Sequence, residues 1–439
     1  MKRDIYKALI DWKRSVRRKP LLLKGARQTG KTYILKEFGK REYRKIHYFN
    51  FEEDSQLTLF FERDIRPLRI ISDLSVYCNC DIHPHEDLIV FDEIQVSNSA
   101  LNSLKYFQEE CNEFHVAAAG SLLGVKMSSP GSFPVGKVNF LTIYPLNFFE
   151  FLDALGQANY RQRLEEVIGF TSLPIPIHEN LINSLQKYYF VGGMPEAVNH
   201  YAQTGELPQV REIQKEIINS YVLDFAKHAP SSDIPKLTLI WNSLVLYLAR
   251  ENKKFMFSAL KKGARAREYE NALTWLENAG LIYSVSAVEC SKFPLEHYAD
   301  RGCFKVYCLD VGLLGALAKT PVNIQNFGKR IFTEYAGAFV ENYVAQQLKC
   351  ITPQNLYYWR SKSGMAELDF LFEADNYIYP LEVKSGVNPK SKSFNSYDQQ
   401  FNPLYLVRTT LLNLRKDDKI CNIPLYAVML LFSLMKKIS

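Results

Sequence analysis

Short apolar runs alternate with helix-like segments along the first 150 residues of the chain. The predicted strands span residues 21–24, 46–51, 88–91, 116–119 and 138–143, and the predicted helices span 31–38 and 100–111. Continuous apolar runs are typical of strands that are buried on both faces, and strands that alternate with helices favour parallel pairing. This part of the chain is therefore predicted to be a parallel sheet covered by helices.

Beyond Pro145 the pattern becomes helical and continues so to about Pro230. From about Ile234 it changes again. A short helix and turn are predicted over 258–263, a helix over 264–279 and a strand over 281–285. In the longer helix the apolar residues recur at the i, i+3, i+4 and i+7 positions, namely Tyr269, Ala272, Leu273 and Leu276. This order of elements is the outline of a winged helix-turn-helix.

The last segment, from about Arg330, predicts a helix over 334–348 and strands over 367–372 and 378–384. The late apolar run from Ile423 to Met435 is interrupted by Ser433 and is too short to span a bilayer. It is predicted to be a core strand or helix, and the chain is expected to have no membrane span.

Composition adds little to this picture. The formal net charge of +7 favours anionic partners only slightly. The eight cysteines include no Cys-x-x-Cys pair, and no apolar signal core follows the first residues. A reduced, cytoplasmic chain is therefore expected.

A complete Gly-x-x-x-x-Gly-Lys-Thr loop lies between the first predicted strand and helix. Backbone N–H groups at a helix N-terminus can surround a phosphate chain only where side chains stay away, and Gly25 and Gly30 provide that clearance. Lys31 is expected to reach the β- and γ-phosphates of ATP, and the Thr32 hydroxyl to ligate Mg²⁺. An ordinary glycine turn is the alternative. The predicted nucleotide-binding residues are Gly25, Ala26, Arg27, Gln28, Thr29, Gly30, Lys31 and Thr32.

Two carboxylates end the apolar strand at 88–91. Asp92 is expected to hold Mg²⁺ together with Thr32, and Glu93 to orient or deprotonate the attacking water. A strand followed by a solvated acidic turn is the alternative. Ser121 follows the strand at 116–119, where a γ-phosphate sensor would stand. The predicted catalytic residues are Lys31, Asp92, Glu93 and Ser121.

Four basic residues lie at the start of the predicted recognition helix, where phosphates and bases would be contacted: Lys261, Lys262, Arg265 and Arg267. They make DNA a candidate partner. The alternative is a winged helix that packs against protein, with these four side chains on a solvated face.

An acidic constellation follows in the last segment. Glu341 lies on the predicted helix, Asp369 on the first strand, and Glu382 and Lys384 on the second. Acids from adjacent strands with a nearby lysine can hold Mg²⁺ and generate a hydroxide beside a phosphodiester. This order of residues predicts a restriction-endonuclease-like core with a second metal site at these four residues. A docking platform of the same fold without nuclease activity is the alternative.

The whole chain resembles the bacterial and archaeal AAA-type ATPases that carry a C-terminal restriction-endonuclease-like domain of unknown function. Beyond the two motifs above, the resemblance rests on Gly120-Ser121, Tyr144-Pro145-Leu146, Gly193-Met194-Pro195-Glu196, Asp310-Val311-Gly312-Leu313 and Glu367-Leu368-Asp369-Phe370. It implies ATP hydrolysis by an AAA+ core. One departure is Gly136-Lys137, where such proteins usually have Gly-Arg, because lysine cannot make the planar two-pronged contact of an arginine finger.

The sequence therefore predicts a multidomain α/β protein with four regions. These are a P-loop AAA+ ATPase core (1–160), a helical lid (161–233), a winged-helix-like domain (234–325) and a restriction-endonuclease-like domain (326–439). The preferred function is an ATPase that couples Mg-ATP binding and hydrolysis to the later regions, with DNA, another protein or a second copy of the chain as candidate partners. The rivals are an ATP-gated, metal-dependent nuclease and a slow-hydrolysing ATP-dependent switch.

Overall fold

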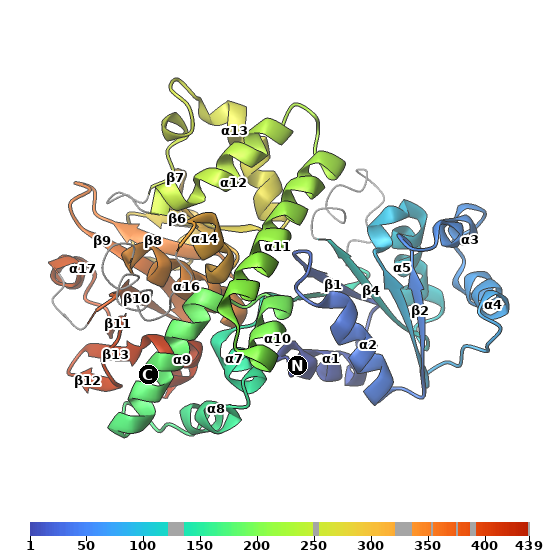
Figure 1. The fold of residues 1–439 in the computed structure, drawn as a ribbon, viewed down its shortest axis with the longest axis horizontal. Coiled ribbons are helices and arrows are strands. Elements are labelled where there is room, and N and C mark those ends of the chain that lie inside the picture. The colour runs from blue at the N-terminus through green and yellow to red at the C-terminus, as the bar shows by residue number, and fades with distance from the viewer. Residues whose placement is uncertain are drawn as a thin grey trace. The chain divides into compact units, whose positions relative to one another are not determined.

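The computed structural model describes residues 1–121, 136–248, 254–320, 336–352, 354–374, 376–386 and 392–437, whose helices and strands are labelled in Figure 1. The chain divides into two compact units. The N-terminal unit comprises residues 2–144 with 278–280, and the C-terminal unit comprises 145–277 and 281–439 with residue 1.

The N-terminal unit contains a five-stranded sheet in the order β2-β3-β4-β1-β5, and every neighbouring pair is parallel. Its strands are β1 (Leu21–Gly25), β2 (Lys45–Asn50), β3 (Asp87–Asp92), β4 (His115–Ser121) and β5 (Asn139–Thr142). The prediction of a parallel sheet with strands at these places is confirmed.

Helices cover both faces of this sheet, and the residues of each strand alternate between two cores. Leu22 packs with α3 (Leu59–Glu62), α4 (Pro67–Tyr77) and α5 (Asn98–Glu110), whereas Leu21 and Leu23 pack with α1 (Ile5–Arg14) and α2 (Lys31–Glu42). Successive side chains of a strand point to opposite faces, so a strand covered on both faces needs the continuous apolar run that the sequence has.

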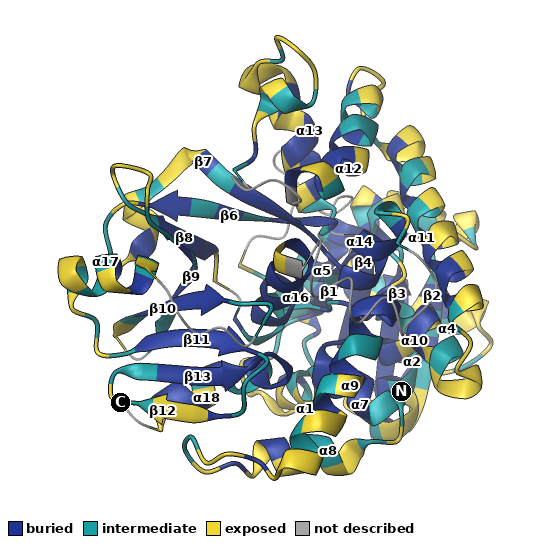
Figure 2. Ribbon diagram, turned by 60° about the vertical axis from the view of Figure 1, so that its left-hand side comes forward, coloured by how far each residue is buried: buried dark blue, intermediate teal, exposed yellow. Residues whose placement is uncertain are grey.

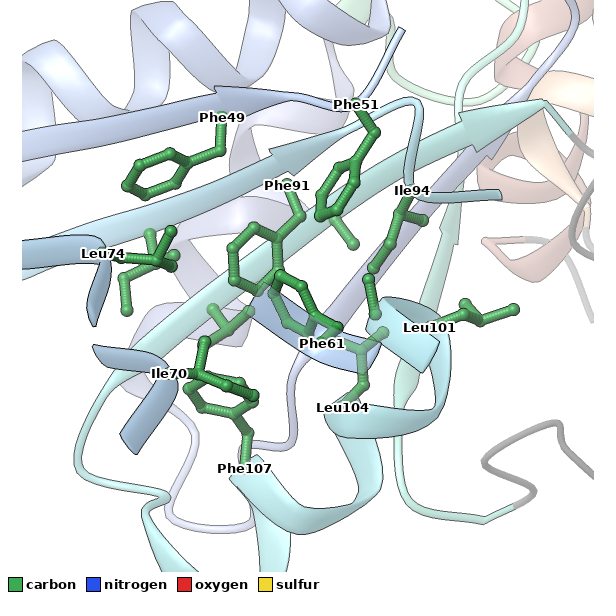
Figure 3. Close-up of a cluster of buried hydrophobic side chains, with 14 of the residues drawn as sticks. Phe49, Phe51, Phe61, Ile70, Leu74, Phe91, Ile94, Leu101, Leu104 and Phe107 are labelled. Carbon is green, nitrogen blue, oxygen red and sulfur yellow. The ribbon is translucent and has the colours of Figure 1, made fainter. Parts of the chain in front are cut away.

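The first of these two cores is rich in aromatic side chains (Figure 3). Phe91 on β3 lies at its centre and contacts four other rings at centroid distances of 5.6–6.1 Å, namely Phe49 on β2, Phe51 just after β2, Phe61 on α3 and Phe107 on α5. These contacts anchor the strand whose end carries Asp92 and Glu93.

The C-terminal unit begins with helices and ends with a mixed sheet. Its helices are α7 (Phe148–Ala154), α8 (Ala158–Glu165), α9 (Ile175–Val191), α10 (Pro195–Thr204), α11 (Leu207–His228), α12 (Ile234–Leu248), α13 (Ala266–Asn278), α14 (Val311–Leu317), α16 (Ala336–Ile351), α17 (Lys392–Phe401) and α18 (Leu431–Lys436). The predicted helical stretch up to about Pro230 is thus confirmed, as is the helix predicted over 264–279.

Among the described residues, eight strands form the sheet of this unit, in the order β12-β13-β11-β10-β9-β8-β6-β7. They are β6 (Ile282–Val288), β7 (Ala299–Cys308), β8 (Leu356–Arg360), β9 (Glu367–Ala374), β10 (Tyr377–Val383), β11 (Leu406–Thr410), β12 (Arg415–Asp417) and β13 (Ile420–Pro424). The central strands are mostly buried, as Figure 2 shows. Helix α16 packs against β7 and β10, and α17 packs against β9.

This sheet contains strands from two of the regions expected from the sequence, 234–325 and 326–439, whose boundaries stay a prediction. Strand β6 follows the predicted recognition helix, yet it pairs in parallel with β8, and Val285 lies opposite Leu356. The sheet therefore crosses the boundary expected between residues 325 and 326. Local patterns predicted β6, β9 and β10, but the pairing of β6 with β8 joins segments far apart in the chain.

The apolar run from Ile423 to Met435 forms the end of β13, a 3₁₀ helix (Leu425–Leu430) and most of α18, and many of its side chains are buried. No helix in the described part of the chain is long and apolar enough to cross a membrane.

Candidate functional site

The loop from Gly25 to Thr32 joins the end of β1 to the start of α2, as predicted. At Gly25 an added Cβ would lie 2.5 Å from the backbone oxygen of Ile143, so a side chain there would collide with backbone. Gly30 has a φ of +94°, in the region that favours glycine. Both glycines of the motif are therefore required by the backbone of this loop.

Ala26 is buried, and its carbonyl accepts a hydrogen bond from the buried Thr29 hydroxyl at 2.8 Å. Arg27 forms an ion pair with Glu52 at 3.2 Å, and Gln28 is exposed with a φ of +63°. The bond from Thr29 closes the loop on itself.

Lys31 is nearly buried, and its ammonium lies over the loop. Its Nζ donates to the carbonyl oxygens of Gly25 at 3.0 Å and Ala26 at 2.9 Å. These carbonyls are neutral, and a hydrogen bond from an ammonium to a phosphate oxygen is stronger than one to a neutral acceptor. A phosphate entering the loop would therefore compete well for this ammonium.

Thr32 in the first turn of α2 and Asp92 at the end of β3 contact each other at one edge of the sheet. The Thr32 hydroxyl donates to Asp92 Oδ2 at 2.6 Å, and the Tyr48 hydroxyl donates to the same oxygen at 2.8 Å. Burial and then the bond to Asp92 raise the pKa of Tyr48, so it stays a donor. A hydroxyl beside a carboxylate is the oxygen donor set that Mg²⁺ prefers, so these two residues fit the ion.

Glu93 follows Asp92 in a left-handed conformation, with a φ of +50°. Its N–H donates to Asp92 Oδ1 at 3.0 Å, and its carboxylate accepts from Gln95 Nε2 at 2.5 Å. These bonds orient the half-buried carboxylate of Glu93 beside Asp92. Its role as the base that activates water stays a prediction.

Ser121 lies at the end of β4, opposite Gly25 in the parallel register of β1 and β4. Its backbone is thus next to the start of the nucleotide loop, and its side chain lies outside the described part of the structure. The role of Ser121 as a phosphate sensor stays a prediction.

Arg3 contacts the loop, although no sequence pattern pointed to it. Its nearly buried guanidinium donates to the carbonyl oxygen of Thr29 at 3.0 Å and to that of Tyr144 at 2.6 Å. In a trans peptide the C=O and the next N–H point in opposite directions. Because Arg3 holds the carbonyl of Thr29, the N–H of Gly30 points the other way. No local motif marks such a contact between distant segments.

Lys137, at the position where an arginine was expected, forms an ion pair with Glu109 on α5 at 2.9 Å. This lysine thus has a partner within its own unit.

The four basic residues of the predicted recognition helix are all exposed, in the turn before α13 and in its first residues. A cavity of about 900 Å³ adjoins them, since Ala264 and Ala266, the neighbours of Arg265, are part of its lining. Its lining also contains Arg301, Arg360 and aromatic rings of Phe255, Phe304 and Tyr357. Contact of these residues with DNA stays a prediction.

The acids of the last segment lie close to two lysines. Glu382 Oε1 is 2.5 Å from Lys384 Nζ, and Asp369 Oδ2 accepts a hydrogen bond from the N–H of Val383 at 2.8 Å. Within the described part of the chain, no group of three or more His, Cys, Asp or Glu is arranged to hold a metal ion. The second metal site at Glu341, Asp369, Glu382 and Lys384 stays a prediction.

Lys305 on β7 was not singled out from the sequence, but its ammonium lies among these acids. Its Nζ is 2.5 Å from Glu367 Oε1, 3.8 Å from Asp369 Oδ1 and 3.9 Å from Glu341 Oε2. Burial lowers the pKa of Lys305, but the three carboxylates outweigh burial and raise it above its ordinary value. The sequence did contain a signal. Lys305 lies two residues from both Cys303 and Tyr307 in β7, and residues two apart in a strand point to the same face.

Two further motifs from the sequence meet at a buried carboxylate. Asp310 accepts hydrogen bonds from the N–H of Gly193 at 2.6 Å, the N–H of Leu313 at 3.0 Å and the Gln346 side chain at 3.0 Å. A Cβ on Gly192 would lie 2.2 Å from Asp310 Oδ1. Burial raises the pKa of Asp310, while these hydrogen bonds oppose the rise. The motifs at 193–196 and 310–313 therefore form a packing junction within the C-terminal unit.

Comparisons with known families match three parts of the chain. Residues 17–152 match a family described as AAA domain. Residues 182–323 match Domain of unknown function (DUF8612), and residues 336–428 match Domain of unknown function (DUF4143). A search of curated proteins found no match.

Similar solved structures include the Walker-type ATPase PABY2304 of Pyrococcus abyssi, with 15% identity, 72% of this chain and 95% of that chain covered, and a TM-score of 0.46. The Orc1 protein of Aeropyrum pernix in complex with DNA has 14% identity, coverages of 72% and 91%, and a TM-score of 0.29. The RuvB Holliday junction branch migration motor of Thermotoga maritima has 12% identity, coverages of 64% and 89%, and a TM-score of 0.29.

The N-terminal unit has the geometry that the family match leads one to expect. This unit has the strand, loop and helix of a nucleotide-binding motif, and its sheet is parallel and covered on both faces. Residues 17–152 match the AAA-domain family, and the N-terminal unit has a parallel-sheet α/β core like that of P-loop ATPases.

Proposed function

We propose that the chain is an ATPase that binds Mg-ATP at residues 25–32 and hydrolyses it with Asp92 and Glu93. The observation that carries this proposal is the 2.6 Å hydrogen bond from Thr32 to Asp92. This bond supports the proposal because Thr32 and Asp92, the two residues expected to bind Mg²⁺, lie side by side next to the loop that would hold the phosphates. When bound, Mg²⁺ would neutralise charge on the phosphates.

The residues of the chain then have separate tasks. The N–H groups of the loop and the Lys31 ammonium bind and orient the phosphates. Glu93 accepts a proton from the attacking water, and its carboxylate is held in place by Gln95. This division supports hydrolysis rather than binding alone, because a carboxylate lies one residue beyond the proposed metal ligand.

An ATPase assay on the purified chain tests the proposal, with Mg²⁺ present or removed by EDTA. We expect phosphate release that needs Mg²⁺ and is lost in Lys31→Ala. ATP binding without measurable turnover would instead favour the slow-hydrolysing switch. Absence of ATP binding in the unmodified chain would overturn the nucleotide site itself.

Nucleic acid is a second candidate for the function of the C-terminal unit. The exposed basic residues from Lys261 to Arg267 adjoin a cavity whose lining includes two arginines and four aromatic residues, together with three glutamates. Arginines can contact phosphates, and aromatic rings can stack on bases. Adding single-stranded or duplex DNA to the ATPase assay tests this candidate, and we expect DNA to change the rate of hydrolysis.

A further inference from the structure

A lysine on β7 lies inside the cluster of acids that was expected to hold a metal ion. Lys305 is only 1% exposed, and its ammonium lies within 4 Å of carboxylates from two other elements, Glu341 on α16 and Glu367 and Asp369 on β9. The ring of Tyr358 lies 4.8 Å from the same Nζ. An ammonium buried at this depth requires negative partners, and these three acids supply them.

The oxygens of the neighbouring acids are largely engaged as well. Asp369 Oδ2 accepts the N–H of Val383, and Glu341 Oε2 accepts the Tyr307 hydroxyl at 3.2 Å. Glu382 Oε1 is paired with Lys384 at 2.5 Å, whereas the buried Oε2 of Glu382 has no hydrogen-bond partner among the described residues.

This donor set does not fit a divalent cation. Mg²⁺ and Ca²⁺ require several oxygen ligands at roughly 2.0–2.6 Å. Oxygens of Glu341, Glu367 and Asp369 already surround an ammonium, which would repel a dication bound to the same carboxylates. A second ammonium, that of Lys384, lies beside Glu382.

We propose that Lys305 is a tethered cation that takes the place of a divalent metal ion in the restriction-endonuclease-like arrangement of Glu341, Asp369 and Glu382. The cluster is then a permanent ion network that holds β7 against β9 and α16. The C-terminal unit of this chain binds no catalytic metal there and does not cut nucleic acid. Removal of the Lys305 charge leaves uncompensated carboxylates and opens the position to a divalent cation.

Calorimetric titration with Mn²⁺ in the absence of nucleotide tests this inference. All variants carry Asp92→Asn, which removes the metal ligand proposed for the nucleotide site. We expect the parent to bind no Mn²⁺ at the cluster and Lys305→Met to gain one ion per chain, with a dissociation constant below about 1 mM. The gain should disappear when Asp369→Asn is added. Lys305→Arg, which keeps the charge, should gain no site.

Two results would overturn the inference. One is a parent protein that binds Mn²⁺ at a site lost in Asp369→Asn, because Lys305 would then coexist with a metal. The other is a folded Lys305→Met variant that binds no Mn²⁺. If Lys305→Met does not fold, the comparison of the parent with Asp369→Asn still decides the matter. Neither result depends on ATP hydrolysis, so the proposed ATPase stands or fails separately.

Discussion

Lys31 in the N-terminal unit and Lys305 in the C-terminal unit are both nearly buried, but the hydrogen-bond acceptors of Lys31 and the ion-pair partners of Lys305 differ in charge. Lys31 donates to the backbone carbonyls of Gly25 and Ala26, which are neutral. Lys305 lies among three carboxylates. A phosphate can replace a neutral acceptor around the first lysine, whereas the charge of the second is already balanced inside the protein.

The comparison shows why a lysine and acids in the right order do not by themselves define an active site. At the nucleotide loop the proposed metal ligands, Thr32 and Asp92, bond to each other, and Lys31 donates to two backbone carbonyls. In the C-terminal cluster the acids form ion pairs with lysines. The charge of the immediate partners decides whether a buried cation is available for a ligand.

The largest expected effect is on the first lysine. Lys31→Ala should abolish detectable ATP binding, because no other charge in the loop is placed to meet the terminal phosphates. Isothermal titration with ATP and Mg²⁺ measures this loss. Lys40→Ala, an exposed change on the same helix, is the matched control and should bind ATP normally. Lys305→Met should also leave ATP affinity unchanged. If Lys31→Ala binds ATP with wild-type affinity, Lys31 does not bind the phosphates and the contrast between the two lysines is wrong.

Glu93→Gln should bind ATP with wild-type affinity and hydrolyse it about 10²- to 10⁴-fold more slowly, because an amide keeps the shape but cannot accept the proton of water. Single-turnover phosphate release measures the rate. Glu52→Gln, which removes the exposed ion-pair partner of Arg27, serves as a control that should keep most of the turnover. Equal rates in Glu93→Gln and wild type would remove the role given to Glu93.

Arg3→Ala should weaken ATP binding about tenfold. Without the guanidinium, the carbonyl of Thr29 loses its hydrogen bond from Arg3, and the Gly30 N–H in the same peptide is no longer held in one direction. Arg3→Lys keeps the charge but not the two-pronged contact and should restore only part of the affinity. Titration with ATP, together with the midpoint of thermal unfolding without nucleotide, separates a local effect on the loop from general destabilisation. A loss of stability with unchanged ATP affinity would make Arg3 a purely structural residue.

Four further cations, in the turn before α13 and at its start, are exposed to solvent, unlike the two buried lysines. Replacing Lys261, Lys262, Arg265 and Arg267 with alanine should weaken DNA binding and reduce its salt dependence, by about 0.9 in the log–log slope for each phosphate that the variant no longer neutralises. Fluorescence anisotropy with labelled duplex DNA over a salt series measures both. If the variant binds DNA as tightly as the unmodified chain at every salt concentration, these residues do not contact DNA and belong to a solvated face.

Much of the N-terminal unit could be predicted from the sequence because its signals are local. An apolar run long enough for a strand, a glycine loop and a following helix are adjacent in the chain, and β1 and α2 form where these signals lie. Asp92 and Glu93 were recognised for the same reason, since they directly follow the apolar run of β3.

The tertiary structure alone decided which distant side chains meet. The contact of Arg3 with Thr29, the pairing of β6 with β8 and the position of Lys305 between α16 and β9 all join segments that are far apart in the chain. The sequence determined that strands, a phosphate loop and two sets of acids are present. Packing determined the charge that surrounds each lysine, because the energy of a buried ion depends on the partners within a few ångströms of it and not on its neighbours in sequence.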